Sequence, residues 1–290
     1  MSSNAFSVGQ CVMAACTLEV TIPKPGNVHR SADFADTSLQ DFLLSAIAIG
    51  PIMDRADELT LGALVRQSVE ATLQVTQQNT NLGMILLLAP LASVACANPE
   101  ALSTVGINEF LQKTTASDCR EIFQGIVLAN PGGIGQVEDF DVRKTEYPSH
   151  ILEAMRLAES RDFIAYQYTH GFCEVIDFVW PEIRNLLRQG QTLSNAVIQT
   201  HLKLMHRFPD SLIARKNGSA VADQSAARAG HVLSAGNVGD TEWLKAVSDF
   251  DFWLRADGNR RNPGTTADLI AAGLFLGLVH REIDLKGVKF

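Results

Sequence analysis

The chain has 290 residues, a formal net charge of −8 and a pI near 5.4. This acidic balance argues against general binding of nucleic acids or anionic membranes, but it leaves room for a small basic pocket that holds a phosphorylated ligand. Hydrophobic residues make up 46% and charged residues 19%, which is typical of a globular chain long enough to bury a sizeable core.

Apolar residues recur at helical spacing along nearly the whole chain. In chain order the expected helices span residues 6–20, 39–53, 61–75, 82–96, 116–128, 151–159, 162–187, 193–207, 217–234, 241–254 and 265–283. The helix of 82–96 is apolar all round, which predicts a central position, and Pro90 predicts a kink in it. Pro181 is expected to kink or split the helix of 162–187.

Strand-like alternation is scarce, with only a weak example at 20–22. A long loop is expected between 130 and 149, where several glycines and prolines interrupt the pattern. The sequence therefore predicts an all-α fold, with a single compact multi-helix domain over 1–290.

No segment predicts insertion into a membrane or export. The most apolar runs, 84–97 and 269–279, are shorter than the ~20 residues that a spanning helix needs. The first basic residue is Lys24, so the charged start of a signal peptide is missing. Five scattered cysteines without CxxC spacing fit free thiols in a reducing compartment. Together these features predict a cytoplasmic protein without a membrane partner.

Polar residues gather in four loop segments between apolar helices, where function tends to collect. In the segment 19–30, two prolines stiffen the chain beside Lys24, His29 and Arg30, a layout that suits contact with phosphate or metal-phosphate. A turn with solvated charges fits the same residues, and residue types alone favour it. In the segment 77–83, one polar side chain is expected to cap a helix, while Asn79 and Asn81 are as consistent with a pocket as with a cap.

The other two segments lie in the second half of the chain. In 208–218, Asp210 is either an N-cap or a metal or ribose contact, and Arg215 is either solvated or a phosphate clamp. In 254–268, a polar loop with Arg261 leads into a helix start, a natural site for an anion. Asp268 in that first turn either forms a capping box with Thr265 or points into a pocket towards Mg²⁺.

Motifs of several common enzyme classes are absent. The sequence has no GxxxxGK[ST] loop, no GxGxxG after a strand, no HExxH and no GxSxG. His170, Glu174 and Asp177 have the spacing to share a helix face, but a hydrogen-bonded polar face is favoured over a metal site.

Three of the polar segments carry motifs whose order spans most of the chain. Glu19 precedes Ile22-Pro-Lys-Pro-Gly-Asn-Val-His29, then come Asn79-Thr-Asn-Leu-Gly83 and Asn262-Pro-Gly-Thr-Thr-Ala-Asp-Leu269. They are similar to a glutamate followed by T-P-K-P-G-L-V-D, to N-T-H-K-G and to H-P-G-G-[ST]-A-D-L in the triphosphoribosyl-dephospho-CoA synthase family. Asp210, Arg215 and Gly218 give a weaker similarity. The chain thus resembles a divergent member of that family.

The resemblance implies an all-α transferase that moves a triphosphoribosyl group from ATP to dephospho-CoA, or to a related coenzyme precursor, and releases adenine. It implies ATP and a coenzyme-like acceptor as partners and Mg²⁺ as cofactor. Carboxylates would stabilise positive charge at the ribose, while Mg²⁺ and arginines would hold the triphosphate. The residues expected in these roles are Glu19 and Asp268 for catalysis, Lys24, Asn27, His29, Asn79, Asn81, Arg215, Arg261 and Asn262 for substrate and phosphate, and Asp210 and Asp268 for the metal.

Four positions depart from the family motifs. Asn81 and Leu82 stand where the family has histidine and lysine, His29 where it has aspartate, and Asn262 where it has histidine. The motifs thus lack a proton-transfer group and a cation that the family has. The resemblance therefore supports the family fold more strongly than it supports the identity of the acceptor. Two alternatives stay open: ribosyl-phosphate transfer to another acceptor, for instance in one-carbon coenzyme biosynthesis, and a non-catalytic member that binds a nucleotide. A homo-oligomer also stays open.

Overall fold

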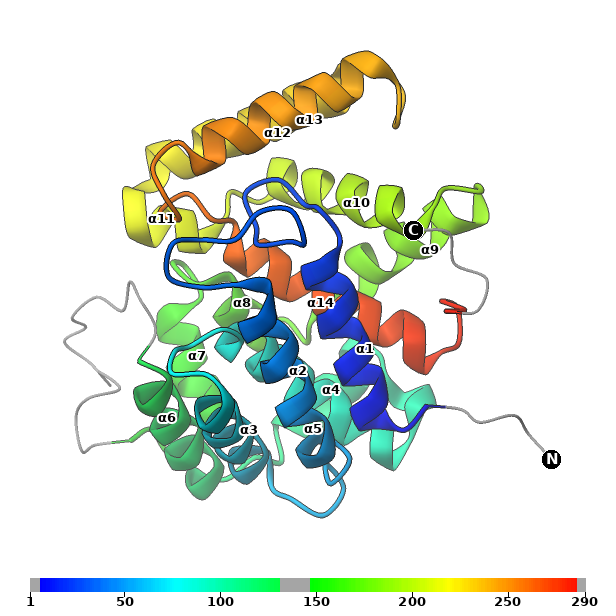
Figure 1. Ribbon diagram of the computed structural model, residues 1–290. Helices are drawn as coiled ribbons and strands as arrows, with labels where there is room; N and C mark the ends of the chain where they lie inside the picture. The colour runs from blue at the N-terminus through cyan, green and yellow to red at the C-terminus, as the bar shows by residue number, and fades with distance from the viewer. Residues whose placement is uncertain (1–5, 131–146, 286–290) are drawn as a thin grey trace.

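A computed structural model describes residues 6–130 and 147–285 of the chain (Figure 1). These residues form fourteen α-helices, a short 3₁₀ helix at Pro99–Ala101 and a π-helical turn at Glu174–Val179. In chain order the α-helices are α1 (Val8–Thr21), α2 (Leu39–Met53), α3 (Leu61–Val75), α4 (Leu82–Ala97), α5 (Thr104–Leu111), α6 (Ala116–Ala129), α7 (Ile151–Ala158), α8 (Phe163–Thr169), α9 (Trp180–Arg188), α10 (Leu193–Arg207), α11 (Ser211–Asn217), α12 (Ser219–Ser234), α13 (Thr241–Arg255) and α14 (Gly264–Val279). Within these residues the only extended pairing is an isolated bridge between His29 and Ala32, so the predicted all-α fold is confirmed.

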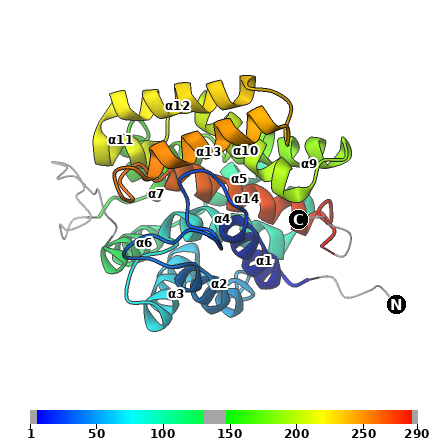
Figure 2. The same ribbon diagram turned by 45° about the horizontal axis from the view of Figure 1, so that its top comes forward.

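Helices α4 and α14 lie at the centre of the molecule in both views (Figure 1 and Figure 2), and they contact each other. Thirteen of the sixteen residues are buried in each of them. A helix that is apolar on every side gains stability only when other elements surround it. Here α1 packs on both central helices, α3 and α8 pack on α4, and α9, α10 and α11 pack on α14. The N-terminal ends of α4 and α14 therefore lie deep inside the fold.

Most of the predicted helices agree with the structure. The bounds of α2, α3 and α10 coincide with the expected 39–53, 61–75 and 193–207. Ser38 caps α2 in a full capping box with Asp41, whose amide hydrogen-bonds the Ser38 hydroxyl. Pro90 lies inside α4, which runs as one helix from Leu82 to Ala97.

The expected helix of 162–187 is instead broken into three pieces. Gly171 and Phe172 have positive φ values of 60° and 62°, which end α8, and the π-helical turn follows before α9. Phe172 is fully buried, so packing of its ring accompanies the left-handed backbone at that position. Pro181 sits in the first turn of α9, where its missing N–H costs nothing, and the break comes before it.

Two helices were missed by the sequence pattern. Short helix α5 was not predicted, and the expected helix of 217–234 is preceded by α11, from which Gly218 separates it with a φ of 90°. The predicted loop between 130 and 149 falls mostly on 131–146, outside the described residues. Asn130 is the left-handed C-cap of α6.

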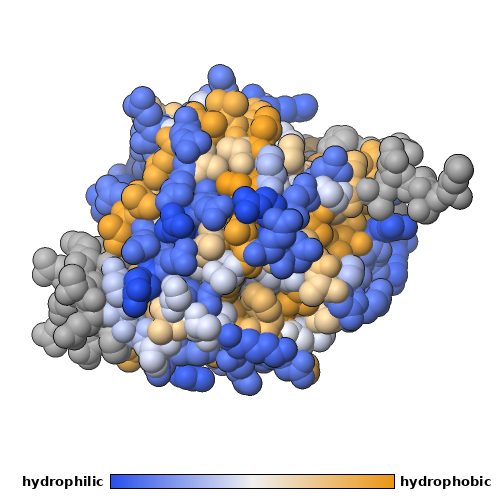
Figure 3. All heavy atoms as spheres, turned by 90° about the horizontal axis from the view of Figure 1, so that it is seen from below, coloured by the Kyte–Doolittle hydropathy of each residue, from blue (hydrophilic) through white to orange (hydrophobic). Residues whose placement is uncertain are grey.

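One face of the molecule carries no single kind of side chain (Figure 3). On the face shown in Figure 3, hydrophilic residues are interleaved with apolar ones. The most exposed large apolar side chains, Phe252 and Val105, belong to different helices, α13 and α5. No helix among the described residues is long and apolar enough to cross a membrane.

Asp118 joins α3 to α6 at their N-terminal ends. Its carboxylate accepts hydrogen bonds from the amide of Gly62 at 2.9 Å and from the amide and hydroxyl of Thr115, both at 2.8 Å. Burial raises the pKa of Asp118, but hydrogen bonds from Gly62, Thr115 and Thr60 outweigh it, so the pKa is lowered.

We expect Asp118→Ala to lower the free energy of unfolding by about 1–2 kcal/mol, because two helix ends lose their cap. A lowered folded-state pKa means that the ionised carboxylate stabilises the fold above its unfolded pKa, near 4, and that this contribution disappears as the pH falls. Thermal unfolding at neutral and acid pH measures both effects. Asp223→Ala on the exposed face of α12 is the control; equal melting temperatures of the two variants at neutral pH would contradict the prediction.

Candidate active site

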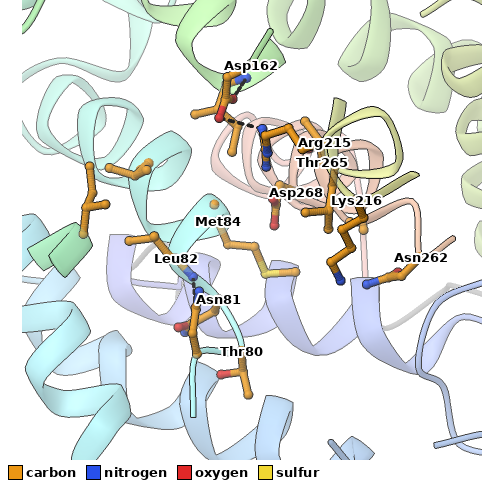
Figure 4. A pocket seen from close by; sticks show the side chains of 18 of the residues that line it. Thr80, Asn81, Leu82, Met84, Asp162, Arg215, Lys216, Asn262, Thr265 and Asp268 are labelled. Carbon is orange, nitrogen blue, oxygen red and sulfur yellow. Dashed lines mark hydrogen bonds and ion pairs between the residues drawn. The ribbon is translucent and has the colours of Figure 1, made fainter. Parts of the chain in front are cut away.

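A cavity of about 820 Å³ opens where the N-terminal ends of α4 and α14 meet the turn after α1 and helix α11 (Figure 4). This volume lies in the upper part of the range for small-molecule sites, roughly 300–1,000 Å³. Of the residues expected in the site, seven line the cavity: Glu19, Asn27, Asn79, Asn81, Arg215, Asn262 and Asp268. Four others lie outside its wall: Lys24, His29, Asp210 and Arg261.

Glu19 and Lys24 form a buried ion pair beneath the cavity. The prolines at 23 and 25 end α1 and turn the chain back, which brings Lys24 Nζ to 2.9 Å from Glu19 Oε1. The same ammonium donates to the backbone carbonyls of Glu19 and Ile22. Because these three acceptors match its three N–H groups and the side chain is fully buried, Lys24 has no donor left for a phosphate. The structure therefore pairs Lys24 with Glu19 and does not support the phosphate contact expected of it.

Asp268 points into the cavity from the first turn of α14 (Figure 4). The capping box with Thr265 does not form, since the Thr265 hydroxyl instead accepts from the hydroxyl of Ser211. No described residue donates a hydrogen bond to the Asp268 carboxyl group. Burial raises its pKa well above the ordinary value and the neighbouring carboxylate of Glu19 adds to the rise, while Arg215 opposes it.

The environments of the two acids differ. Burial also raises the pKa of Glu19, but the charge and hydrogen bond of Lys24 act in the opposite direction. Two neighbouring carboxyl groups beside one ammonium group favour a single negative charge, and the ion pair with Lys24 favours placing that charge on Glu19. The two acids are therefore unequal: Lys24 favours the ionised form of Glu19, whereas burial favours the protonated form of Asp268.

Asn79 and Asn81 divide the two roles considered for the 77–83 segment. Asn79 Oδ1 accepts from the Leu82 amide at 3.0 Å and so caps α4. Asn81 accepts from the Thr72 hydroxyl at 3.1 Å, and its buried Nδ2 has no acceptor within the described part of the chain. Both residues line the cavity, and the Asn81 Nδ2 is a buried donor without an acceptor beside it.

Asp210 is a structural link between α11 and α14. One carboxylate oxygen accepts from the amides of Leu212 and Ile213, and the other from the amide and hydroxyl of Thr266 at 2.8 Å each. These four hydrogen bonds occupy the four lone-pair positions of the carboxylate. The expected metal role of Asp210 is therefore not supported, and its carboxylate fills the anion site predicted at the start of α14.

Arg215 lies in the cavity wall, where its guanidinium binds the carboxylate of Asp162 with an N–O distance of 2.7 Å. Asp162 also caps α8 through the Ile164 amide at 2.9 Å. The next residue, Lys216, lines the cavity as well. Lys216, Asp162 and Asn259 were missed because their neighbours in the site come from distant parts of the chain.

His29 and Arg261 serve the surrounding framework. His29 pairs with Ala32 in the isolated bridge, and burial followed by the charge of Arg255 lowers its pKa. Arg261 donates to the Trp253 carbonyl at 2.9 Å and stacks on its ring. Neither residue lines the cavity, so the structure does not support the substrate contacts expected of them.

A model of the ATP:dephospho-CoA triphosphoribosyl transferase family matches residues 5–286. The chain belongs to this family. A Pseudomonas fluorescens Pf-5 protein named "Probable 2-(5''-triphosphoribosyl)-3'-dephosphocoenzyme-A synthase" is 25% identical over 273 residues, which cover 88% of this chain and 84% of that protein. A protein of the same name from P. fluorescens Pf0-1 is 24% identical, with 91% and 88% covered.

A solved structure agrees with the fold of this transferase. The crystal structure of an Archaeoglobus fulgidus protein assigned to the triphosphoribosyl-dephospho-CoA synthases has a TM-score of 0.60 and 24% identity, and the match covers 82% of this chain and 98% of that one. Family membership makes the chain a transferase that moves a triphosphoribosyl group from ATP to dephospho-CoA or a related coenzyme precursor, with release of adenine.

Gly83 leaves space for the carboxyl group of Asp268. A Cβ at position 83 would lie 1.9 Å from Asp268 Oδ2 and 2.5 Å from its Cγ, so the Asp268 carboxyl group packs directly on the glycine backbone at the start of α4. Any side chain there displaces the carboxyl group.

We expect Gly83→Ala to lower kcat by about 10²-fold, the cost of misplacing a reacting group by roughly 1 Å, without unfolding the protein. Steady-state kinetics and circular dichroism measure the two parts. Gly125→Ala on α6 is the matched control, because the nearest atom to its added Cβ is 3.5 Å away. Unchanged kcat in Gly83→Ala would remove the positional argument for Asp268.

Proposed function

We propose that Glu19 and Asp268 act as a base and an acid in triphosphoribosyl transfer. The observation that carries the proposal is the meeting of these two carboxyl groups in one cavity, with Lys24 paired to only one of them. The pair then supplies both proton transfers that the reaction needs.

The bond that breaks joins ribose to adenine, and the bond that forms joins the same ribose carbon to a hydroxyl oxygen of the acceptor. The Asp268 carboxyl group gives its proton to the departing adenine nitrogen, and Glu19 takes the proton of the acceptor hydroxyl. Positive charge that develops on the ribose is stabilised by the negative charge of Glu19. One proton has moved onto the base and one onto the leaving group, so the charges balance, and a proton returns from Glu19 to Asp268 through solvent.

Mg²⁺ as cofactor is part of this proposal. Mg²⁺ in nucleotide sites is held by one or two carboxylates together with phosphates and water, so few protein ligands are required. Among the described residues no three His, Cys, Asp or Glu side chains come together, so phosphates and water would supply most of the ligands. Asp268, the ligand expected from the sequence, carries a proton in the step proposed here and would be available to the ion only after it has given that proton up. When bound, the ion would neutralise charge on the triphosphate.

The proposal places the enzyme in the cytoplasm, where ATP and coenzyme precursors are available. The five cysteines agree with this location, since all of them are free thiols.

Adenine release tests the reaction. We expect purified protein with ATP, Mg²⁺ and dephospho-CoA to release adenine, measured by chromatography, and to release little without dephospho-CoA. Release that is independent of dephospho-CoA would make water the acceptor. No release from folded protein that binds ATP would favour a different acceptor or the non-catalytic alternative.

The pH dependence of kcat/KM tests the two acids. We expect activity to fall at low pH as Glu19 takes a proton and at high pH as Asp268 loses its proton. Glu19→Gln and Asp268→Asn should each lower kcat by roughly 10²–10⁴-fold, and each should remove its own limb of the profile.

Lys24→Met sharpens the same test. Loss of the cation removes the influence that lowers the pKa of Glu19, so the acid limb should move to higher pH while the alkaline limb stays. A profile with the same limbs in all three variants is the outcome that would refute the assignment.

A further inference from the structure

The cavity has two chemically different ends. At one end, Lys216 and Asn262 face each other across the opening between α11 and the loop before α14, and Leu82 and Met84 lie on the other side of Asp268 (Figure 4). Helices α4, α6 and α7 supply a wall of apolar side chains, namely Leu86, Phe123, Ile126, Met155, Leu157 and Ala158. A ligand with a charged part and an apolar part therefore has one favoured direction in this cavity.

Lys216 is the charged group at the polar end. It is half-buried, and no described residue accepts a hydrogen bond from its ammonium or forms an ion pair with it. Burial lowers its pKa, while the carboxylates of Asp36 and Asp210 and the guanidinium of Arg215 act on it from nearby. Asp210 is occupied by its four hydrogen bonds, and both oxygens of Asp36 accept from Asn259 Nδ2, at 3.1 and 3.2 Å.

The side-chain amide of Asn262 provides a second hydrogen-bond donor at this end of the cavity. Asn262 Oδ1 accepts from Asn27 Nδ2 at 2.8 Å, which fixes the orientation of the Asn262 amide and leaves its Nδ2 directed away from Asn27. No described residue accepts from this Nδ2. An ammonium and an amide N–H on one side of a cavity, both without protein acceptors, form a site for an anion with several oxygens.

The other cations near the cavity are less available. Arg215 forms an ion pair with Asp162, and Lys24 forms one with Glu19. Arg161 is exposed at the edge. Lys216 is thus the cation whose charge is free to meet a ligand inside the cavity.

We infer that Lys216 and Asn262 bind the triphosphate of the donor nucleotide, so that the ribose lies over Glu19 and Asp268 and the acceptor enters along the apolar wall of α6 and α7. This inference rests on the proposed function for the identity of the donor. The triphosphate-binding role of Lys216 itself depends only on the geometry of the polar end.

Inorganic tripolyphosphate is the probe, because its binding requires no catalysis. Isothermal titration with the full chain should show Lys216→Met to bind it about 10- to 100-fold more weakly than the wild type, the effect of losing one hydrogen bond to a charged group. Lys245→Met on the exposed face of α13 removes the same charge away from the cavity and should bind as the wild type does. Equal affinity in Lys216→Met, or no binding to the wild type, would overturn the inference.

Ala158→Phe tests the other end. The larger side chain fills the apolar wall, so we expect weaker binding of dephospho-CoA with unchanged affinity for tripolyphosphate. If this variant instead loses tripolyphosphate while its melting temperature is kept, the two ends are assigned the wrong way round.

These measurements separate the inference from the proposed reaction. A wild type that binds tripolyphosphate through Lys216 but releases no adenine would contradict the reaction and keep the site. Normal adenine release with a Lys216→Met variant that has unchanged KM for ATP and unchanged affinity for tripolyphosphate would keep the reaction and remove the site.

Discussion

Two helices without a polar face, α4 and α14, dictate the arrangement of the whole molecule. Each must be enclosed on all sides, and the surrounding helices supply that enclosure. Enclosure also carries their N-terminal ends into the interior, where Asn81 is buried and Asp268 is partly buried in the cavity wall. The cavity forms at these ends because polar groups there need space and partners that an apolar core does not provide.

Local sequence patterns were sufficient for most of the fold and for part of the site. Apolar periodicity located α2, α3 and α10 to the residue, since a long amphipathic helix leaves the same signal wherever it packs. Polar residues at the start of all-apolar helices pointed correctly to Asn81 and Asp268 as cavity residues. The break between α8 and α9 had no such signal, because a buried Phe172 in a left-handed conformation is a consequence of tertiary packing.

Local sequence patterns could not predict the roles of residues whose partners lie far away in the chain. Nothing local distinguishes a lysine that binds phosphate from Lys24, which turns inward to Glu19. Asp210 has the pattern of an N-cap, but its second contact is Thr266, 56 residues away. Arg215 and Lys216 are adjacent and both cationic, yet Asp162 binds only the arginine, and that pairing appears only in the folded chain.

Three carboxyl groups at or near the cavity differ in the hydrogen-bond donors that reach them. Asp210 is satisfied by four N–H and O–H groups and Glu19 by a lysine, whereas Asp268 has no hydrogen bond from the described residues. A carboxylate without hydrogen bonds in that position lowers the stability of the folded protein. Proteins commonly accept such a loss of stability at functional sites. The group that we propose as the acid is thus the one that the described residues leave without a hydrogen bond.

Helix α11 connects the donor side of the site into one unit. Asp210 ties its start to α14, and Arg215 ties its end to Asp162 at the start of α8. Arg215 is therefore fixed relative to Asp268, and the apolar wall comes from α6 and α7. Helix α7 is joined to this unit as well, because it packs on α8 and the Asp162 amide donates to the Ala158 carbonyl at 2.9 Å. Asp162 thus connects the polar end of the cavity, through Arg215, with the apolar wall, through the end of α7. A substitution that shifts the end of α7 would reach the polar end through this single residue.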